Sequence, residues 1–257
     1  MQLFPDNAAD GSAVSLQSFY GNRPNVDLMF NTSNIGFAQA VNAVAREANT
    51  DWILILNPDF ILGRDALFRL KAALENDDRA GLAGAAVNDE YGQLQRATVR
   101  RFPDPWRSLM TASGLWRLGR WVPAFHGVEI QPAENLEDTQ ICDAVSGACM
   151  LLRRAALEEV GYLDEAYAMH CEDLDLMYRL KQKGWHCLYV PRAECVHLQG
   201  LSSRSRPTWV HFQKHRGMAR FFRKFQAETK PFPVRWLVYA GIWLRFMILW
   251  PQTLIKR

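Results

Sequence analysis

The first half of the chain alternates short apolar runs with segments of helical periodicity, and this alternation limits the possible folds more than any other feature. Strands are predicted at 26–30, 52–56 and 80–87, and helices at 37–48 and 64–75 between them. Strands that alternate with helices of this length are typical of a sheet wrapped by helices. The sequence therefore predicts an α/β fold with a mostly parallel central sheet.

The second half of the chain returns to this alternation after a long irregular segment. Residues 88–140 are rich in tryptophan, proline and glycine and show little periodicity, so we expect a helical or irregular insert there. The apolar run that follows predicts a strand at 145–152. The remaining predicted elements are helices at 153–160, ended by Gly161, and at 171–183, ended by Gly184, and short strands at 188–190 and 195–198 around Pro191.

The tripeptide Asn57-Pro58-Asp59 follows the most apolar predicted strand. In open α/β sheets, ligands bind beyond the carboxyl ends of the strands, and the proline fixes a turn there. A carboxylate at such a position can hold Mg²⁺ or Mn²⁺, which neutralises a diphosphate leaving group. The alternative is an ordinary capped turn.

Three acids, Glu172, Asp173 and Asp175, open the predicted helix at 171–183. Acids in the first turn of a helix commonly only compensate its dipole. The same rigid position also suits a general base that deprotonates an acceptor hydroxyl. Two neighbouring carboxylates repel, which raises the pKa of one of them. Both interpretations can hold together.

His197 lies on a short predicted strand that leads into a Gly-Ser loop. A single histidine on a strand is more often a structural residue than a ligand. Together with the distant carboxylate of Asp59, however, its imidazole would form a mixed oxygen and nitrogen site that accepts Mn²⁺ or Mg²⁺.

Two segments, 6–12 and 31–42, place Asn, Asp and Gly between a predicted strand and a predicted helix. Side-chain amides and exposed backbone N–H groups at such positions can bind a nucleotide. Ordinary turn chemistry explains the same residues equally well.

Charge is distributed unevenly along the chain. The formal net charge is +3, but residues 201–257 contain twelve Lys and Arg against the single acid Glu228. A basic C-terminal segment can bind nucleic acid or anionic lipid, or it can simply be exposed to solvent. Five aromatic residues lie among Leu and Ile between positions 234 and 251, which favours a membrane–water interface and not nucleic acid. We predict a membrane-associating or packing helix at 226–257, with a buried helix and a true span as alternatives.

The five cysteines form no CxxC pair and are odd in number, so neither a zinc ribbon nor a closed disulfide framework is indicated. Reduced thiols are the simplest interpretation. The first twelve residues lack the basic and apolar regions of a signal peptide. We therefore expect a cytoplasmic protein that is peripheral on the inner face of the membrane.

The order of these pieces carries a resemblance to a known family. The blocks DNAADGS, NTSNIGFAQAVN, LNPD, SGACMLLRR, GYLDEAY, CEDLDLMYRL and YVPRAECVHLQGLSS resemble the successive blocks of family 2 glycosyltransferases, most closely the bacterial rhamnosyltransferase-like branch. The resemblance covers roughly residues 4–225, which would form one GT-A domain. It implies an inverting enzyme that moves a sugar from a nucleotide-diphosphate donor to a glycan or lipid-linked acceptor in cell-surface polysaccharide synthesis. A rhamnose nucleotide is the first donor to consider, with UDP sugars next.

The resemblance also implies residue roles on the donor side. Asp6 would contact the base or ribose of the nucleotide. The other nucleotide-sugar positions are Asn34, Gly36, Asn42 and Asn57. A divalent cation, Mg²⁺ or Mn²⁺, would be the cofactor.

On the catalytic side, Asp59 and His197 match the metal-ligand positions of the family, and Asp173 matches the catalytic base. Glu172 and Asp175 would support the acceptor side. One base and one metal-stabilised diphosphate suit a single in-line displacement.

One departure from the family concerns the N-terminus. Family members open with a further strand and helix, so this chain is expected to be N-terminally truncated relative to them. A catalytically inactive glycosyltransferase-like protein that binds a partner or a membrane through the basic tail is therefore the alternative function. A nucleotidyltransferase is disfavoured, because the N-terminal region has no glycine- and lysine-rich phosphate loop.

Overall fold

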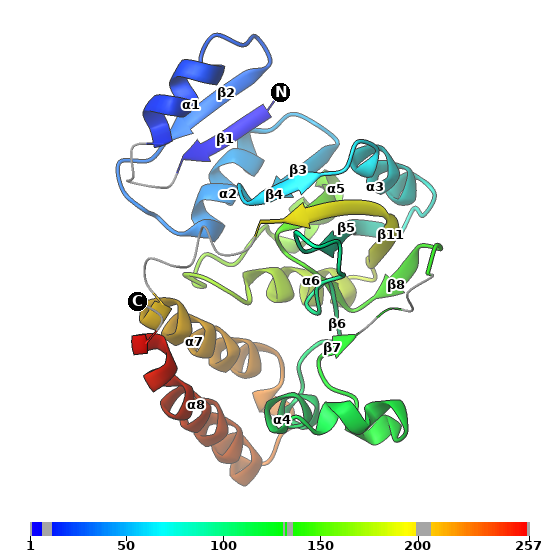
Figure 1. Cartoon of the computed structure of the whole chain (residues 1–257), viewed down its shortest axis with the longest axis vertical. Coiled ribbons are helices and arrows are strands. Elements are labelled where there is room, and N and C mark those ends of the chain that lie inside the picture. The colour runs from blue at the N-terminus through cyan, green and yellow to red at the C-terminus, as the bar shows by residue number, and fades with distance from the viewer. Residues whose placement is uncertain (1, 7–11, 131, 133–135, 199–206, 256–257) are drawn as a thin grey trace.

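The computed structural model describes residues 2–6, 12–130, 132, 136–198 and 207–255 (Figure 1). A six-stranded sheet with the order β3-β10-β5-β11-β4 forms its centre, and β8 pairs with β11 beside this path. The strands of this sheet are β3 (Trp52–Leu56), β4 (Phe60–Leu62), β5 (Ala80–Asn88), β8 (Gln140–Cys142), β10 (Cys149–Arg153) and β11 (His186–His197).

The central sheet is mixed, which corrects the prediction of a mostly parallel one. β5 and β11 pair in parallel, and β10 lies antiparallel between β3 and β5, so β3, β5 and β11 share one direction. β4 and β8 pair with β11 in the antiparallel sense. The α/β class itself is confirmed.

β11 is one strand of 12 residues and not the two short strands that were predicted around Pro191. Its pairing with β5 shifts between Val190 and Glu194, so the residues between them bulge out of the ladder. Proline has no N–H to donate, and a bulge accommodates it without ending the strand.

Helices cover both faces of the sheet. Along β5 the side chains alternate between two cores, with Leu82 in one and Ala83 in the other. The first core contains residues of α2 (Phe37–Glu47), α5 (Arg154–Val160) and α6 (Glu172–Gln182). The second contains Leu70 and Leu74 of α3 (Ala66–Glu75), both fully buried. These four helices confirm the predicted ones, with ends that shift by one or two residues.

The N-terminal elements form a small unit of their own. β1 (Gln2–Asp6) pairs in parallel with β2 (Val26–Phe30), and α1 (Ser12–Tyr20) lies between them in sequence. Within the described residues, this two-stranded sheet is not hydrogen-bonded to the central one. Figure 1 shows it at the end of the molecule next to α2.

The predicted irregular insert contains a second small sheet and short helices. β6 (Val99–Arg100) pairs with β7 (Glu129–Ile130) and with β9 (Ala144–Val145), and α4 (Pro105–Ser113) is followed by 3-10 turns at Leu115–Arg120 and Pro123–Phe125. This sheet packs directly on β5, since a Cβ at Gly84 would lie 2.4 Å from Cγ2 of Val145. The single strand predicted at 145–152 is therefore split into β9 and β10, with residues 146–148 as a loop between them.

Two helices form a hairpin at the C-terminal end. α7 (Pro207–Phe225) and α8 (Phe232–Ile255) are joined by a 3-10 turn at Ala227–Thr229. The ring of Phe246 contacts those of His211 and His215, and Phe222 contacts Tyr239, so the helices run antiparallel. Figure 1 shows α8 on the outside of this pair.

Candidate active site

The carboxyl ends of three parallel strands meet at one edge of the central sheet. β3 ends at Leu56 and continues into Asn57-Pro58-Asp59, and β11 ends at His197. The N–H of Leu198 donates a 2.8 Å hydrogen bond to the backbone carbonyl of Asp59, which holds these two segments together. Open α/β sheets bind their ligands at such an edge.

Asp59 and His197 face each other at this edge. Nε2 of His197 lies 3.4 Å from Oδ2 of Asp59, and Asp59 is buried with 6% of its surface exposed. The imidazole stacks on the ring of Phe60 at a centroid distance of 4.3 Å. Its other nitrogen, Nδ1, lies 3.1 Å from Oε1 of Gln95, so Nδ1 donates to this oxygen and Nε2 is the nitrogen that faces Asp59.

This donor pair fits a hard divalent cation. Ligands at about 2.1 Å from Mg²⁺ in octahedral geometry are about 3 Å apart when they are adjacent, close to the observed separation of the two donor atoms. A carboxylate oxygen and an imidazole nitrogen whose lone pairs face each other repel unless a cation or a proton lies between them. In the described part of the chain, no three His, Cys, Asp or Glu side chains gather into a metal cluster. Phosphate oxygens and water would therefore complete such a coordination shell, as is usual for Mg²⁺.

Asp173 reaches the same edge through the loop between β9 and β10. The N–H of Asn57 donates to the carbonyl of Ala148 at 2.9 Å. Gly147 is the residue before Ala148, and a Cβ added to it would lie 2.5 Å from Cβ of Asp173. Asp173 and the Asp59 turn thus both contact this short loop, and only glycine at position 147 allows so close an approach of Asp173.

The backbone before Asp173 is strained. His170 and Cys171 have φ values of 65° and 71°, so two consecutive residues other than glycine adopt the left-handed conformation. Such outliers persist where the surrounding structure over-determines them, and they cluster at functional sites. Here α7 packs against the strained pair, because a Cβ at Gly217 would lie 2.8 Å from the carbonyl oxygen of His170.

Arg100 pairs with the carboxylate of Asp173. Its guanidinium donates to Oδ2 of Asp173 at 2.6 Å and to the carbonyl of Val145 at 2.5 Å. Burial favours the neutral form of Asp173, but the charge and the hydrogen bond of Arg100 outweigh burial and lower the pKa of this carboxyl. Asp173 is therefore ionised at neutral pH.

Glu172 behaves in the opposite way. Burial and the neighbouring charge of Asp173 raise the pKa of Glu172 to about 8, so its carboxyl is largely protonated at neutral pH. Its Oε2 is buried without a hydrogen-bond partner among the described residues. The repulsion that was predicted between neighbouring acids thus shifts the pKa of Glu172 and not that of Asp173.

Asp175 lies apart from the other two acids. Two residues along a helix turn the side chain by about 200°, so Asp175 faces away from Asp173. Its side chain is 0% exposed, and its oxygens accept hydrogen bonds from Arg179 at 2.6 Å and Lys224 at 2.7 Å. This placement corrects the expectation of an acceptor-side position, because the carboxylate holds α6 against α7 inside the protein.

The predicted nucleotide-binding residues occupy different environments. Asn34 is exposed and accepts a 3.0 Å hydrogen bond from the N–H of Gly36, whose φ of 94° opens α2. Asn42 is 1% exposed, and its amide donates to Leu163 and Glu165 and accepts from Leu163. Asn42 thus holds a core loop, and because burial and these bonds occupy its amide, it is not available for the nucleotide-sugar contact that was predicted. Asp6 ends β1, and residues 7–11 lie outside the described residues.

Three residues of the site were given no role from the sequence. Gln95 and Arg100 belong to the segment that was predicted to be irregular, and Gly147 was predicted to lie within a strand. Their functional positions depend on contacts with residues 102, 73 and 26 positions away, respectively. Contacts over such distances in the chain cannot be predicted from a local sequence pattern.

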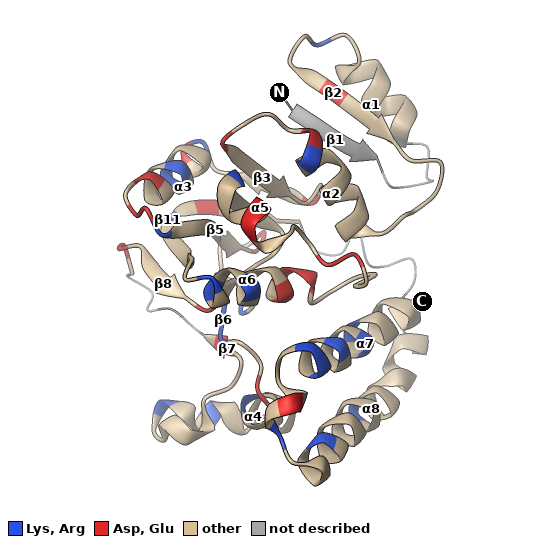
Figure 2. Cartoon of the chain, turned by 180° about the vertical axis from the view of Figure 1, so that it is seen from behind, with Lys and Arg blue, Asp and Glu red and all other residues tan. Residues whose placement is uncertain are grey.

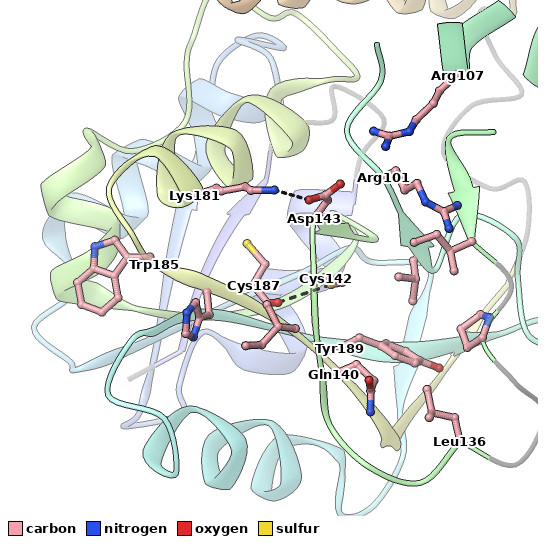
Figure 3. A pocket seen from close by; sticks show the side chains of 15 residues that line it. Arg101, Arg107, Leu136, Gln140, Cys142, Asp143, Lys181, Trp185, Cys187 and Tyr189 are labelled. Atoms are coloured by element: carbon pink, nitrogen blue, oxygen red, sulfur yellow. Dashed lines mark hydrogen bonds and ion pairs between the residues drawn. The ribbon is translucent and has the colours of Figure 1, made fainter. Parts of the chain in front are cut away.

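A cavity of about 520 Å³ lies elsewhere in the molecule (Figure 3). Its walls include Cys187 and Tyr189 near the start of β11, the opposite end of the strand from His197. Figure 3 shows Lys181 directed towards Asp143 across its upper side, at a distance of 2.6 Å. Size alone does not make this cavity the active site, and the facing pair Asp59 and His197 lies at the other end of β11.

Comparisons with known proteins agree with the geometry. The sequence profile described as glycosyltransferase like family 2 matches residues 16–219. An N-acetylglucosaminyl-diphospho-decaprenol L-rhamnosyltransferase of Mycobacterium tuberculosis is 29% identical over 95% of this chain and 81% of its own length. The rhamnosyltransferase WbbL of Escherichia coli is 30% identical over 62% of this chain and 57% of its own length.

Solved structures share the fold. A mannosyltransferase, PcManGT from Pyrobaculum calidifontis, in complex with GDP-Man and Mn²⁺, superposes with a TM-score of 0.56 at 17% identity over 99% of this chain and 64% of its own. GalNAc-T7 with UDP, GalNAc and Mn²⁺ superposes with a TM-score of 0.58 at 14% identity over 86% of this chain and 41% of its own. The profile match over most of the sequence therefore establishes that this chain belongs to glycosyltransferase family 2, and its similarity to the two rhamnosyltransferases places it in the rhamnosyltransferase-like branch.

Proposed function

We propose that this glycosyltransferase transfers a sugar with inversion, from a nucleotide-diphosphate donor to a hydroxyl of a glycan or lipid-linked acceptor in cell-surface polysaccharide synthesis. The observation that carries the proposal is the position of Asp59, His197 and Asp173 at one edge of the sheet, around the loop of Gly147. Inversion needs one base and one leaving-group site, and these residues supply one of each.

In the proposed reaction, Asp173 is the general base. Its ionised carboxylate takes the proton of the acceptor hydroxyl while the hydroxyl oxygen bonds to the anomeric carbon of the donor sugar. The bond from that carbon to the nucleoside diphosphate breaks, and the diphosphate leaves with the electron pair. Arg100 positions Asp173 through the 2.6 Å hydrogen bond, and the glycine at 147 lets the acceptor side and the donor side come close.

Asp59 and His197 would hold the cofactor. A divalent cation bound there supplies the charge that neutralises the leaving diphosphate. Gln95 fixes the imidazole in the orientation that leaves Nε2 available. The presence of Mn²⁺ in the names of both solved relatives supports this assignment.

The donor and acceptor are inferred from the relatives. Both curated relatives are named as rhamnosyltransferases, which makes a rhamnose nucleotide the first donor to test. The name of the mycobacterial relative contains a diphospho-decaprenol acceptor, so a lipid-linked diphosphate is the first acceptor. Asn34, Gly36 and Asn57, together with Asp6, are the proposed nucleotide-sugar contacts.

We also propose that α8 contacts the membrane. The stretch Phe232–Leu254 is long and apolar enough to cross a membrane, with a mean hydropathy of 1.3 and none of its most apolar window buried. Its outward side is a stripe of large apolar residues, which we call the α8 stripe: Phe232, Trp236, Leu237, Leu244, Met247, Ile248 and Leu254. Figure 2 shows the basic positions of α7, in blue, on the helix beside α8. A wide exposed apolar patch beside cations fits the surface of an anionic membrane.

The proposed organisation follows from this contact. Residues 1–225 would form the catalytic domain, and residues 226–257 the membrane-associating segment on the inner face of the cell membrane. The alternative function is a catalytically inactive binding protein that keeps the membrane contact. The following experiments separate the two.

Replacing the base tests the reaction directly. Asp173→Asn should abolish sugar transfer, by about a hundredfold or more, and leave nucleotide-sugar affinity within about twofold, because the amide cannot accept the proton. Transfer and donor binding are measured on the same preparations. Asp51→Asn, an exposed acid before β3, is the matched control. Turnover near that of the wild type in Asp173→Asn would exclude Asp173 as the base, and no transfer by the wild type with any nucleotide sugar would favour the inactive alternative.

The metal assignment is tested by binding. Wild-type protein should bind the nucleotide-diphosphate sugar about tenfold more tightly with Mn²⁺ than with a chelator, and Asp59→Ala and His197→Ala should each lose most of this difference. Calorimetric titration of the donor with and without Mn²⁺ measures it. The same metal dependence in all three proteins would show that the cation binds elsewhere.

The raised pKa of Glu172 predicts a pH-dependent stability. Its folded pKa of about 8 lies above the value of about 4.3 in an unfolded chain, so its contribution to stability is complete below about pH 4 and is lost as the pH rises to about 8. Glu172→Gln removes this titration. Between pH 5 and pH 8 the wild type should therefore lose more free energy of unfolding than Glu172→Gln, by a few kcal/mol in order of magnitude, in denaturant titrations. Glu47→Gln, at an exposed site, should follow the wild type, and parallel curves for all three proteins would contradict the burial of a protonated Glu172.

The membrane contact is tested with liposomes. The protein should sediment with anionic liposomes, and less so at high salt. Leu244→Asp combined with Ile248→Asp should weaken this binding about tenfold or more, since both side chains are more than 60% exposed on the α8 stripe. Phe68→Asp, on a 76% exposed residue of α3, is the matched control. Equal loss of binding in the control, or none in the double variant, would contradict an α8 contact.

A further inference from the structure

One face of α7 is directed at the catalytic edge. Gly217 packs on the strained pair before Asp173, with its hypothetical Cβ 2.8 Å from the His170 carbonyl and 3.2 Å from Sγ of Cys171. Residues three positions apart on a helix lie on the same face. Lys214 therefore extends from the face of α7 that meets this loop, one turn before Gly217.

The neighbouring helix contributes a second cation to the same region. Arg245 is the single charged residue between Trp236 and Ile255 of α8, and it does not belong to the α8 stripe. Its Nη1 lies 3.5 Å from Nε2 of His215, the residue after Lys214. Nδ1 of His215 lies 2.8 Å from the carbonyl of His211, so Nδ1 carries the hydrogen and Nε2 can accept from Arg245. The arginine is thus held towards α7 and not towards lipid.

His215 supports this arrangement because it stays neutral. Burial lowers the pKa of His215 to about 4, and the nearby charges of Arg245 and Lys214 act in the same direction. A neutral imidazole can accept a hydrogen bond from a guanidinium, whereas a charged one would repel it. His215 is completely buried, so it is a positioning residue and not a ligand contact.

Lys214 and Arg245 bring two positive charges to the same region. The ion pairs that α7 makes with acids use Arg220 and Lys224, and within the described residues neither Lys214 nor Arg245 takes part in one. Burial and the charge of Arg245 lower the pKa of Lys214, with Glu129 as an acid that acts in the opposite direction. Lys214 nevertheless keeps an exposed side chain that a ligand can reach. Two close cations without a counterion are suited to a phosphate group.

We propose that Lys214 and Arg245 bind the phosphate groups of a lipid-linked diphosphate acceptor, between the α8 stripe and Asp173. The position fits the ligand at both ends. The apolar chain would leave towards the membrane along α8, and the first sugar would extend past the strained loop to the base. This inference rests on the proposed function, because it assigns a binding site to the acceptor of that reaction.

Binding without turnover tests the site. Neutral phosphatidylcholine vesicles carry farnesyl diphosphate, farnesol or phosphatidylglycerol at the same mole fraction, and sedimentation measures the bound protein. The wild type should prefer farnesyl diphosphate over the other two lipids by about tenfold. Lys214→Ala and Arg245→Ala should each lose most of this preference, and Arg245→Lys should retain part of it. Arg223→Ala, which removes an exposed cation from the same helix, should bind like the wild type.

The possible outcomes are distinct. Equal binding of farnesyl diphosphate and phosphatidylglycerol by the wild type would show only a general anionic surface and would overturn the proposal. An unchanged preference in both alanine variants, or an equal loss in Arg223→Ala, would also overturn it. Melting curves that match the wild type establish that each variant is folded, and Lys214→Gln and Arg245→Gln replace any variant that is not. A wild type that shows the preference but transfers no sugar would instead contradict the proposed function and leave the phosphate site standing.

Discussion

The common direction of β3, β5 and β11 is the constraint on which the site depends. Because these strands end at the same edge of the sheet, residues 59 and 197 come within 3.4 Å of each other although they are far apart in the chain. β10 runs against them, so its beginning lies at that edge as well, and the loop before it meets Asp173. Strand direction therefore brings together Asp59, His197 and the loop that contacts Asp173.

Electrostatics then distinguishes two neighbouring acids. Arg100 keeps Asp173 ionised, while Glu172, one residue away, is buried, forms no ion pair among the described residues and holds a proton. In the proposed reaction, an ionised Asp173 beside a protonated Glu172 leaves one of these two acids able to accept a proton, as a single displacement requires. The strained backbone at residues 170 and 171 fixes this orientation, and α7 packs on it from outside. The C-terminal hairpin thus connects the catalytic edge to the α8 stripe.

Sequence reasoning was reliable where local pattern decides structure. Strands such as Trp52–Leu56 were predicted at their observed ends, because a continuous apolar run bounded by polar residues specifies a buried strand. The predictions were wrong where a contact between residues far apart in the chain determines the structure. The strand β11 continues through Pro191 only because its bulge is held by the pairing with β5 on both sides. Likewise, Asn42 binds a loop 121 residues away, and Arg100 comes from a segment without periodicity. Asp59, His197 and Asp173 were candidates from their local positions, where a structural role was an equally good explanation, and the resemblance to the family then favoured the catalytic roles.

The most direct test of the central claim is a crystal structure of the protein with Mn²⁺ and a nucleotide-diphosphate sugar. Our account predicts that the cation is bound by Asp59 and by Nε2 of His197, that the diphosphate completes its coordination, and that the carboxylate of Asp173 faces the anomeric carbon on the side opposite the diphosphate. Nucleotide and metal bound away from this edge, for example in the cavity beside Cys187 and Tyr189, would contradict it.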